Sequence, residues 1–462
     1  MRSRRDFIKK STLAATGSFI ASSTFGHFII GKKPKVIIIG AGFAGLAAAY
    51  YLFKKKIDFV ILEARDRIGG RVFSYTTDTS EKFVVELGAE WIGDSHKRLL
   101  QLCDEFQLEL IDNRMKTHLR YKGQYADPLR FEQMKDKDWI EKWEQLKKAY
   151  AGIPENKRDA TFDYYDWWRY LKNNGCPDFD LDIHELMDST DFGESIRHLS
   201  AAAALSWYAD PGLTSTHNEM DKKIKGGNDT LAKKIAEKIG MENIIKNDAV
   251  VEIEQYPGKQ VKVTCTSGRS YYGDKIICTV PTYSLKKITW KPGLPMSILR
   301  GIDELQYARI NKHAVQFGKK FWGDDHFDMI TDDQVHYLYH ATIGQHPEKG
   351  VLISYSIGDK ADLFGWNGKN DKWNTTLLGE ALSPGFGDIT NLVEKQWNYY
   401  WGNDNYSLGS YAFFKPGQWK RVQKELNTPF INTHFAGEHL AGWQGFMEGA
   451  INTGEEAAGK TG

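Results

Sequence analysis

A short apolar run followed by three closely spaced glycines constrains the fold of this chain more than any other feature. Residues 36–39 are uninterruptedly apolar, and Gly40, Gly42 and Gly45 follow them in the spacing G-x-G-x-x-G. Such a run is typical of a strand buried on both faces. The first glycine allows a tight turn, the second allows close approach of a ligand to the backbone, and the third allows the next helix to pack against the strand. The pattern therefore predicts a strand, a turn and a helix over residues 47–53.

An acidic residue at the end of a second predicted strand completes this unit. Residues 57–62 form the second apolar run, and Glu63 stands at its end, where a carboxylate can accept a hydrogen bond from a ribose hydroxyl. The N-terminus of the intervening helix faces the position that a pyrophosphate would take. Strand, glycines, helix, strand and acid within about 30 residues indicate a site for an ADP-containing dinucleotide. The alternative is a glycine-rich turn without a ligand.

Length, charge and cysteine usage limit the classes of function. The chain has 462 residues, enough for two or more domains, and its 41% hydrophobic and 26% charged residues are those of an ordinary globular protein. A net charge of +1 gives no reason to expect a nucleic-acid partner. No two of Cys103, Cys176, Cys265 and Cys278 form a C-x-x-C pair, so neither a metal site nor a thioredoxin-like motif is expected. Whether a disulfide forms stays open.

The first residues resemble an export signal. The pair Arg4 and Arg5 is followed by Phe7 and Ile8, and then by an uncharged stretch to about residue 30. This pattern is similar to the bacterial twin-arginine signal, although a basic tail before a weak helix is an alternative. The stretch is only mildly hydrophobic, which favours a signal over a permanent anchor. We therefore expect residues 1–32 to be a signal segment, the twin-arginine export machinery to be a partner, and the protein to be periplasmic or secreted.

The rest of the chain divides into segments of different character. Residues 96–217 show helical periodicity and many charges, and the apolar run at 200–208 predicts a buried helix. Residues 300–400 alternate strand and short helix patterns. Further strands are predicted at residues 249–254, 260–266, 275–280 and the start of 433–438, with turns at 257–258 and 267–268, and a final helix is predicted from about residue 445.

Four widely spaced blocks carry a more specific pattern. They are residues 40–71, which end in Gly69, Gly70 and Arg71; residues 86–93; residues 225–227; and residues 435–438 followed by 445–450. Together, and in this order, they resemble the flavin-containing amine oxidase family, which includes monoamine oxidases, polyamine oxidases and L-amino acid oxidases. The resemblance covers nearly the whole chain after residue 33.

This resemblance implies an α/β fold of two domains. The first is a Rossmann-like FAD-binding domain built from discontinuous segments, and the second is an α+β substrate domain that combines a mixed sheet with helices. We assign residues 33–95, 218–292 and 402–462 to the FAD-binding domain, and residues 96–217 and 293–401 to the substrate-binding domain.

The family's cofactor contacts carry over onto the four blocks. The glycine pair before Arg71 lets backbone amides and a guanidinium approach phosphate or flavin oxygens. Glu438 resembles the acid that accepts a hydrogen bond from the cofactor, and Met447 resembles the residue whose N–H donates to the pyrimidine edge, where the helix dipole stabilises negative charge. Val250 resembles the residue whose backbone pairs with adenine. By this resemblance the cofactor-binding residues are Gly40, Gly42, Ala44, Gly45, Glu63, Ala64, Arg65, Gly70, Arg71, Gly88, Ala89, Glu90, Trp91, Val250, Trp401, Gly437, Glu438, Phe446 and Met447.

Four residues are the candidates for catalysis. Lys312 precedes Trp322 by ten residues, the spacing of a family lysine that contacts flavin N5 through water. The alternative for Lys312 is a solvent-facing strand lysine. Trp401 resembles a tryptophan that flanks the flavin, and Tyr411 and Phe446 resemble the two walls of an aromatic cage. Many amine oxidases have tyrosine at the position of Phe446. Ordinary core packing is the alternative for these aromatic residues.

The resemblance implies oxidation of an amine by FAD, with dioxygen as acceptor and an imine, ammonia and hydrogen peroxide as products. Ser410 stands where vertebrate monoamine oxidases carry the cysteine that binds the flavin, so we expect non-covalent FAD. The segment from Gly88 to Trp91 has no arginine for a substrate carboxylate, which favours amines over L-amino acids, the alternative substrates. Glu90 is either structural or faces a second amino group. Because a neutral amine reacts, we expect activity to rise toward alkaline pH.

Two other classes of protein stay open from the sequence. A nicotinamide-dependent reductase would share the first glycine motif but would not need the later blocks. A catalytically silent flavoprotein would keep Gly40, Glu63 and Glu438 and could dispense with Lys312. The sequence also leaves the oligomeric state open, a homodimer included.

Overall fold

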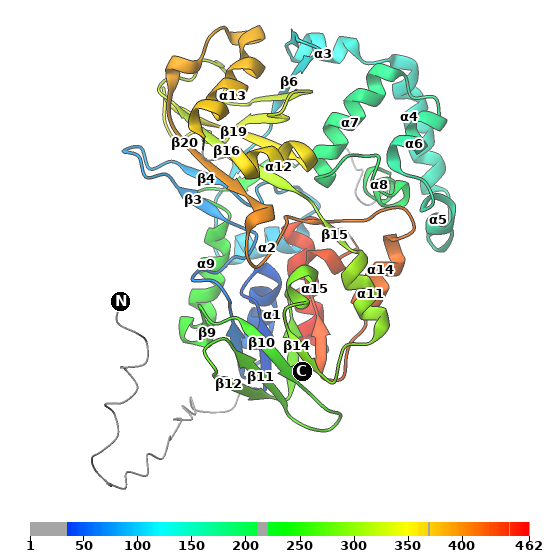
Figure 1. Ribbon diagram of the computed structural model, residues 1–462, viewed down its shortest axis with the longest axis vertical. Coiled ribbons are helices and arrows are strands. Elements are labelled where there is room, and N and C mark those ends of the chain that lie inside the picture. Colours follow the sequence, from blue (N-terminus) through cyan, green and yellow to red (C-terminus); the bar gives the residue numbers. More distant parts are fainter. Residues whose placement is uncertain (1–34, 210–219, 368–369, 443, 462) are drawn as a thin grey trace, which may run out of the picture. The chain divides into compact units, whose positions relative to one another are not determined.

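The computed structural model describes residues 35–209, 220–367, 370–442 and 444–461 (Figure 1). The predicted signal segment, residues 1–32, lies outside the described residues. Within the described residues, no helix combines the length and the apolar character that crossing a bilayer requires.

A five-stranded parallel sheet holds the predicted glycine motif. Val36 and Ile38 of its central strand contribute to the core beneath α1, while Ile37 and Ile39 contribute to the core on the opposite face, so this strand is buried on both faces as predicted. The sheet has the order β22-β13-β1-β2-β9, with strands β1 (Val36–Ile39), β2 (Phe59–Leu62), β9 (Ile244–Ile245), β13 (Lys275–Cys278) and β22 (Thr433–Phe435). The helices α1 (Phe43–Lys54), α2 (Lys97–Glu105), α9 (Asp229–Ile239) and α15 (Met447–Gly459) share the core on its first face.

A small second sheet covers the other face of the parallel sheet. Ile253, Val261 and Val263 of this sheet lie in the same core as Ile37 and Ile39. Its order is β12-β11-β10-β14, with β10 (Val250–Glu254), β11 (Val261–Cys265), β12 (Ser270–Gly273) and β14 (Thr289–Lys291). The sequence analysis gave the turn at 267–268 but not β12, because the segment Ser-Tyr-Tyr-Gly lacks an apolar alternation.

A seven-stranded mixed sheet forms the centre of the second region. Its order is β20-β16-β19-β18-β17-β6-β7, in which β17 and β6 are parallel and the other neighbours are antiparallel. The strands are β6 (Lys116–Tyr121), β7 (Gln124–Ala126), β16 (Ile310–Phe317), β17 (Phe327–Thr331), β18 (Tyr337–His340), β19 (Gly350–Ile357) and β20 (Val393–Tyr400). Strands β16 and β19 are buried along their whole length.

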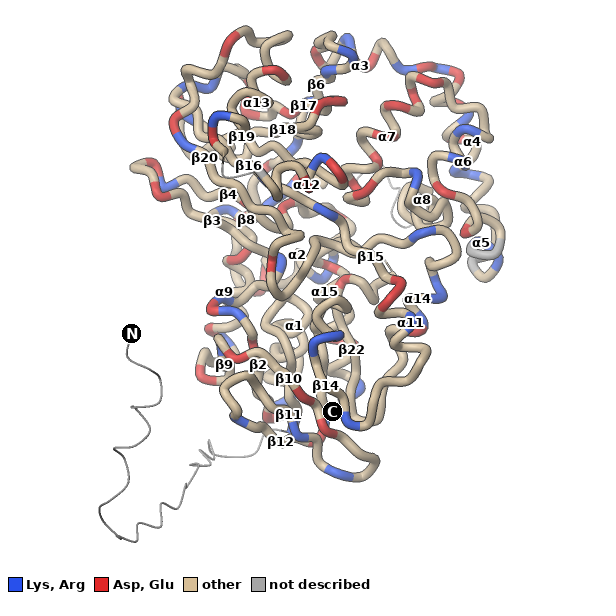
Figure 2. The backbone as a smooth tube through the Cα atoms, in the orientation of Figure 1, with Lys and Arg blue, Asp and Glu red and all other residues tan. Residues whose placement is uncertain are grey.

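A group of helices stands beside this sheet (Figure 1). Phe131, Ile183 and Leu186 of these helices share a core with Leu119 and Ile330 of the sheet. The helices are α3 (Pro128–Met134), α4 (Lys137–Ala151), α5 (Glu155–Phe162), α6 (Trp167–Asn173), α7 (Asp178–Phe192) and α8 (Ala201–Tyr208). As predicted, the first five residues of α8 are buried. Figure 2 shows Lys and Arg interspersed with Asp and Glu along this group, in keeping with the net charge of +1.

Short paired strands and further helices complete the fold. The paired strands are β3 (Ser74–Thr76) with β4 (Val84–Glu86), β5 (Leu110–Asp112) with β8 (Lys222–Ile224), and β15 (Gln306–Tyr307) with β21 (Ala412–Phe413). The remaining helices are α10 (Thr282–Leu285), α11 (Met296–Glu304), α12 (Gly358–Asn367), α13 (Asp371–Phe386) and α14 (Trp419–Leu426). Single 3-10 turns lie at Met241–Asn243, Thr390–Leu392, Trp401–Asn403 and Glu438–Leu440.

Helix α2 packs with the helices that cover the parallel sheet, although the sequence analysis assigned residues 96–217 to the substrate domain. Leu99, Leu102 and Cys103 belong to the core of α1 and α15. The domain division itself stays a proposal, and this packing moves its first boundary to the end of α2. All four cysteines are buried free thiols.

Candidate active site

A cavity of about 980 Å³ joins the two regions of the fold. At one end it is lined by residues that follow the carboxyl ends of the parallel strands, where open α/β sheets bind their ligands. At the other end it is lined by strands β16–β19 and by the end of α7. The predicted site residues that line it are Gly40, Gly42, Ala44, Glu63, Ala64, Arg65, Gly70, Arg71, Gly88, Ala89, Glu90, Trp91, Val250, Lys312, Trp401, Tyr411, Gly437, Glu438, Phe446 and Met447.

Gly45 is the one predicted site residue that does not line the cavity. A Cβ added to it would lie 1.9 Å from the carbonyl oxygen of Gly40. Gly45 therefore serves the close packing of α1 on the preceding turn. Gly40 itself has φ +104°, a conformation that other residues rarely adopt, so the turn requires a glycine there.

Glu63 organises the nucleotide end of the cavity. Its carboxylate accepts hydrogen bonds from the backbone N–H of Ala41, at 2.6 Å, and from that of Arg65, at 2.8 Å. These hydrogen bonds connect the end of strand β2 to the glycine turn. Helix α1 starts after Gly42 with no side-chain cap and no acidic residue in its first turn, so its positive end is free to face an anion such as a pyrophosphate.

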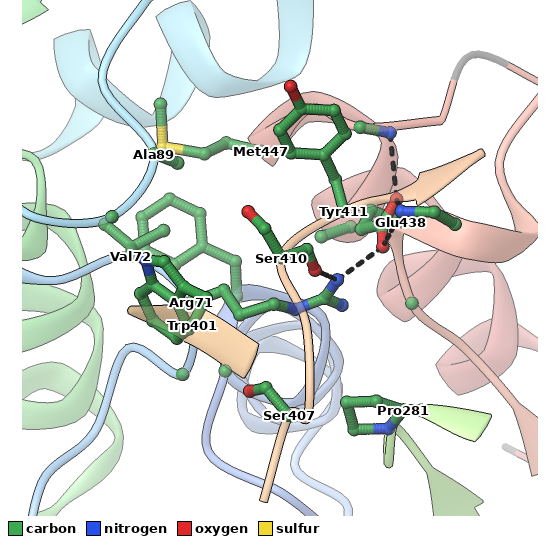
Figure 3. A pocket seen from close by; sticks show the side chains of 18 of the residues that line it. Arg71, Val72, Ala89, Pro281, Trp401, Ser407, Ser410, Tyr411, Glu438 and Met447 are labelled. Atoms are coloured by element: carbon green, nitrogen blue, oxygen red, sulfur yellow. Dashed lines mark hydrogen bonds and ion pairs between the residues drawn. The ribbon is translucent and has the colours of Figure 1, made fainter. Parts of the chain in front are cut away.

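Arg71 and Glu438 form a partly buried ion pair at the wall of the cavity. Figure 3 shows the guanidinium of Arg71 between the carboxylate of Glu438 and the backbone carbonyl of Ser410, to both of which it donates. Glu438 also accepts from the N–H of Ala412, at 3.2 Å, and from that of Gly445, at 2.8 Å. Burial opposes the charge of Arg71, but Glu438 outweighs it and raises the pKa of the guanidinium. Glu438 thus joins the turn after β22 to the segments that carry Ser410 and Gly445.

The N-terminus of the last helix, α15, also lies at the cavity wall. Phe446 is the N-cap of α15 and has no side-chain cap bond, and Met447 begins the helix at the cavity wall. The acidic residue of this first turn, Glu448, is turned away and accepts from the N–H groups of Arg98 and Leu99. The positive end of α15 is therefore directed to the cavity and can stabilise a negatively charged group there.

Lys312 is buried and not solvent-facing, with 2% of its surface exposed. Its ammonium donates to the carbonyls of Glu86, at 2.9 Å, and Gly88, at 2.8 Å, and lies 3.3 Å from the carboxylate of Glu90. These contacts fix it on the segment that lines the cavity. Burial lowers the pKa of Lys312 in spite of the attraction of Glu90.

Glu90 is shared by two lysines. Lys223 lies 3.2 Å from it and also donates to the carbonyl of Ala341, at 2.8 Å. The hydroxyl of Tyr339 donates to Glu90 as well. Burial disfavours the charge of Glu90, but the two lysines outweigh it and lower the pKa of the carboxyl. These partners agree with the structural alternative for Glu90, although it also lines the cavity. Lys223 is a residue that the sequence analysis did not single out.

Aromatic side chains surround the catalytic candidates. The hydroxyl of Tyr411 donates to the carbonyl of Thr190, at 2.9 Å, and lies 2.7 Å from the hydroxyl of Tyr355. Burial raises the pKa of Tyr411 well above its usual value, so it stays neutral. Trp401 is 1% exposed, and its indole N–H donates to the carbonyl of Leu87, at 2.8 Å. Tyr355 was not predicted, although it stands directly opposite Lys312 on β19.

Two acidic residues that the sequence analysis did not single out line the far end of the cavity. They are Asp191, at the end of α7, and Asp328, on β17. Neither belongs to a recognisable motif, and only the three-dimensional fold brings them to the cavity that holds Lys312. Among the described residues, the lysines and arginines that line the cavity are Arg65, Arg71, Lys287 and Lys312.

The residues that line the cavity are suited to bind a flavin dinucleotide. The starts of helices α1 and α15, neither of which has a side-chain cap, both lie at the cavity wall. A Cβ on Gly70 would lie 3.1 Å from the Cα of Gly42, so backbone lines this part of the wall. Glu63 and Val250 would hold the adenosine end, the start of α1 the pyrophosphate, and Arg71 and Met447 the ring system.

Comparison with known proteins shows the family of this chain. The sequence model of the family described as "Flavin containing amine oxidoreductase" matches residues 43–460. The chain is 24% identical to the flavin-containing amine oxidase B of Sus scrofa, over 92% of this chain and 86% of that protein. It is 25% identical to the L-amino acid dehydrogenase of a Synechocystis strain, over 91% and 93% of the two chains. It is also 25% identical to the L-amino acid oxidase of Bothrops pictus, over 95% and 92%.

Solved structures of the same fold include two enzymes named for amines. Putrescine oxidase with bound putrescine superimposes with a TM-score of 0.82 at 21% identity, covering 93% of this chain and 99% of that one. Cyclohexylamine oxidase of Brevibacterium oxydans gives a TM-score of 0.80 at 20% identity, with the same coverage. These structures confirm the predicted α/β architecture. The chain therefore belongs to the flavin-containing amine oxidoreductase family and is an oxidoreductase.

Proposed function

We propose that this protein binds FAD without a covalent bond and oxidises an amine with dioxygen as the acceptor. The amine loses two electrons and two protons to become an imine, which water hydrolyses to a carbonyl compound and ammonia, and dioxygen becomes hydrogen peroxide. The observation that carries the proposal is the burial of Lys312 at the wall of a cavity that also holds Tyr411, Phe446 and Trp401. A nicotinamide-dependent reductase would need the glycine motif but none of this group.

The chain's own residues position and desolvate the substrate. Arg71 and Met447 would hold the flavin ring, and the flavin, when bound, would supply the two-electron redox chemistry of the reaction. The cage side chain Tyr411 is fixed by Tyr355 and Thr190, so its ring orientation is set before the substrate arrives. Lys312 is held by two backbone carbonyls beside the segment from Gly88 to Trp91.

The charges of the cavity favour amines over L-amino acids. A substrate carboxylate needs a free cation, and the described cavity lysines and arginines already have partners. Arg71 pairs with Glu438 and Arg65 with Asp404, while Lys312 lies beside Glu90 and Lys287 donates to the carbonyl of Asn405. The oxidation of L-amino acids stays the second candidate because two relatives are named for that substrate class.

A peroxide-coupled assay of the purified flavoprotein tests the proposal. The panel contains phenylethylamine, tyramine, putrescine, spermidine and the twenty L-amino acids. We expect peroxide from amines, and a rate that rises toward alkaline pH because the neutral amine is the reacting form. Peroxide from L-amino acids alone would replace amines by the second candidate, and the consumption of NADPH without amine oxidation would favour a reductase.

The non-covalent attachment of FAD rests on Ser410. Its side chain is a hydroxyl at the cavity wall, which forms no thioether with a flavin. Acid precipitation of the holoprotein should therefore leave the yellow colour in the supernatant. Flavin that stays with the precipitate would contradict this part of the proposal.

Export by the twin-arginine route is the proposal for residues 1–32. It rests on Arg4 and Arg5 and on the uncharged stretch behind them. In a bacterial host with this route, the full chain should reach the periplasm or the medium with its flavin bound. The double variant Arg4→Lys/Arg5→Lys should stay in the cytoplasm, and equal export of both proteins would contradict the proposal.

A further inference from the structure

The backbone of residues 86–91 holds Lys312 at the cavity wall. The carbonyls of Glu86 and Gly88 accept hydrogen bonds from its ammonium, at 2.9 and 2.8 Å. The last four residues of this segment, 88–91, line the cavity together with Lys312. The position of the segment therefore decides where the ammonium of Lys312 lies.

Asn228 holds the same segment from the side away from the cavity. Its side-chain amide donates to the carbonyls of Ala89, at 3.1 Å, and Glu90, at 2.7 Å, and its side-chain oxygen accepts from the N–H of Ile224, at 2.9 Å. An asparagine amide has two N–H donors, so both of them are used on this segment. Asn228 is fully buried and does not line the cavity itself.

The side chain of Asn228 is free for this contact because other residues cap its helix. Asn228 is the N-cap of α9, where asparagine usually accepts from an N–H of the first turn, but its side chain makes no such bond. The N–H groups of Asn228 and Asp229 donate instead to the side chains of Glu86, at 2.7 Å, and Ser74, at 3.1 Å. Strands β3 and β4 therefore supply the caps, and the amide of Asn228 is left for residues 86–91.

Strand β8, which precedes Asn228, runs along the same segment. Lys222 exchanges two backbone hydrogen bonds with Ile92, at 2.8 and 3.0 Å. The ammonium of Lys223 lies 3.2 Å from the carboxylate of Glu90. Residues 222–228 thus contact the cavity segment at several points, and Asn228 makes the contact that lies next in the chain to Gly88.

We propose that Asn228 is a positioning residue for the oxidation of the amine. It holds the carbonyl of Ala89, so that the neighbouring carbonyl of Gly88 keeps the ammonium of Lys312 at its place in the cavity wall. This inference rests on the proposed function, in which Lys312 takes part in the reaction. Because Asn228 does not reach the cavity, its effect passes through the lysine. A shift of a reacting group by about 1 Å can lower a rate by about 100-fold.

A double-mutant cycle between Asn228 and Lys312 tests the inference. Asn228→Ala removes the amide, whereas Asn228→Asp keeps its shape and the acceptor for Ile224 but loses the two N–H donors. The rate of flavin reduction is measured by anaerobic stopped-flow at a saturating concentration of the best amine of the panel. We expect both variants to lower this rate about 10-fold or more. In the Lys312→Met background, where no ammonium is left to position, the same changes should alter it by less than about 3-fold.

Hydrogen–deuterium exchange of the holoprotein measures the support of the segment independently of the reaction. The amides of residues 86–92 should exchange about 5-fold faster or more in Asn228→Ala than in the wild type. Asn243→Ala is the matched control, because the amide of Asn243 also donates to a carbonyl, that of Ile239, at 2.7 Å, at the other end of α9. This variant should leave both the exchange and the rate unchanged. Flavin content and melting temperature show whether each variant has folded.

The possible outcomes are distinct. A loss of equal size in the two backgrounds would overturn the inference, because the effect of Asn228 would then not pass through Lys312. A wild-type rate in Asn228→Asp, or unchanged exchange of residues 86–92, would overturn it as well. If Asn228→Ala fails to hold flavin, Asn228→Asp decides. A wild-type flavin that no amine of the panel reduces would contradict the proposed function itself.

Discussion

Lys312 and Lys223 share one buried carboxylate beside the cavity, that of Glu90. Glu90 is fully buried and contacts both ammonium groups. The neighbouring Glu86 is also buried, and burial followed by repulsion from Glu90 raises the pKa of its carboxyl to about 7. When Glu86 carries a proton, Glu90 is the one carboxylate that the two lysines share.

The first prediction concerns Lys312 itself. Lys312→Met keeps the length and apolar stem of the side chain but removes the ammonium, so we expect the rate of flavin reduction by amine to fall about 100-fold or more. Anaerobic stopped-flow spectroscopy at the flavin absorption band measures this rate, and flavin content should be retained. Lys395→Met, on the neighbouring strand β20, removes a surface lysine paired with Asp78 and is the control. An unchanged rate in Lys312→Met would remove this residue from the site.

A second prediction at this scale follows from the cost of ionising Asp328. Burial raises its pKa from 3.8 to about 7, so above pH 7 the folded state carries a charge that the unfolded state bears more easily. As the pH falls through 7 toward 4, the folded state takes up the proton and the penalty disappears. Asp328→Asn should therefore stabilise the protein at pH 8, by up to about 4 kcal/mol at about 1.4 kcal/mol per pKa unit.

Urea unfolding at pH 8 and pH 5 measures this effect. The gain of Asp328→Asn over the wild type should shrink at pH 5, whereas Asp182→Asn, whose carboxylate is exposed, should show no such trend. A gain in stability that is equal at the two pH values would show that burial does not destabilise the ionised form of Asp328.

Among the elements, helices α1 and α15 depend on glycine for their close contact. A Cβ on Gly454 would lie 2.1 Å from the carbonyl oxygen of Ala44, a backbone atom that has no room to move. We predict that Gly454→Ala pushes the start of α15 away from the cavity. The expected loss of stability is about 1–3 kcal/mol, the usual cost of overpacking, together with a weaker affinity for FAD.

Thermal unfolding and a flavin titration check this prediction. Gly293→Ala is the control, because a Cβ at Gly293 meets no atom within 4 Å. If Gly454→Ala unfolds and binds flavin like Gly293→Ala, the contact between α1 and α15 does not position the flavin end of the site.

Local patterns predicted the elements well where a single segment carries the signal. The strand at 36–39, its glycine turn and the buried helix at 200–208 are all confirmed. The hairpin strand β12 was missed because its residues are polar and aromatic. The amphipathic pattern of α2 indicates that one face is buried, but not against which partner, so its packing with α1 and α15 could not be predicted from the sequence.

At the scale of the whole molecule, the cavity is assembled from segments that lie far apart in the chain. The sequence predicted the cofactor end because each contact sits in a short motif. The substrate end was predicted only in part, since Asp191, Tyr355 and Asp328 come from three elements whose meeting depends on tertiary packing. None of these residues is unusual in its local sequence, so only the fold identifies them.

The most direct test of the central claim is an anaerobic titration of the purified holoprotein with an amine, followed by air. Butane-1,4-diamine should bleach the oxidised flavin spectrum in a 1:1 ratio of amine oxidised to flavin. Admission of dioxygen should then restore the spectrum and release one equivalent of hydrogen peroxide. A flavin spectrum that no amine in the panel bleaches would contradict the proposed reaction. A protein that binds no flavin after reconstitution would contradict the assignment of the cavity as a flavin-binding site.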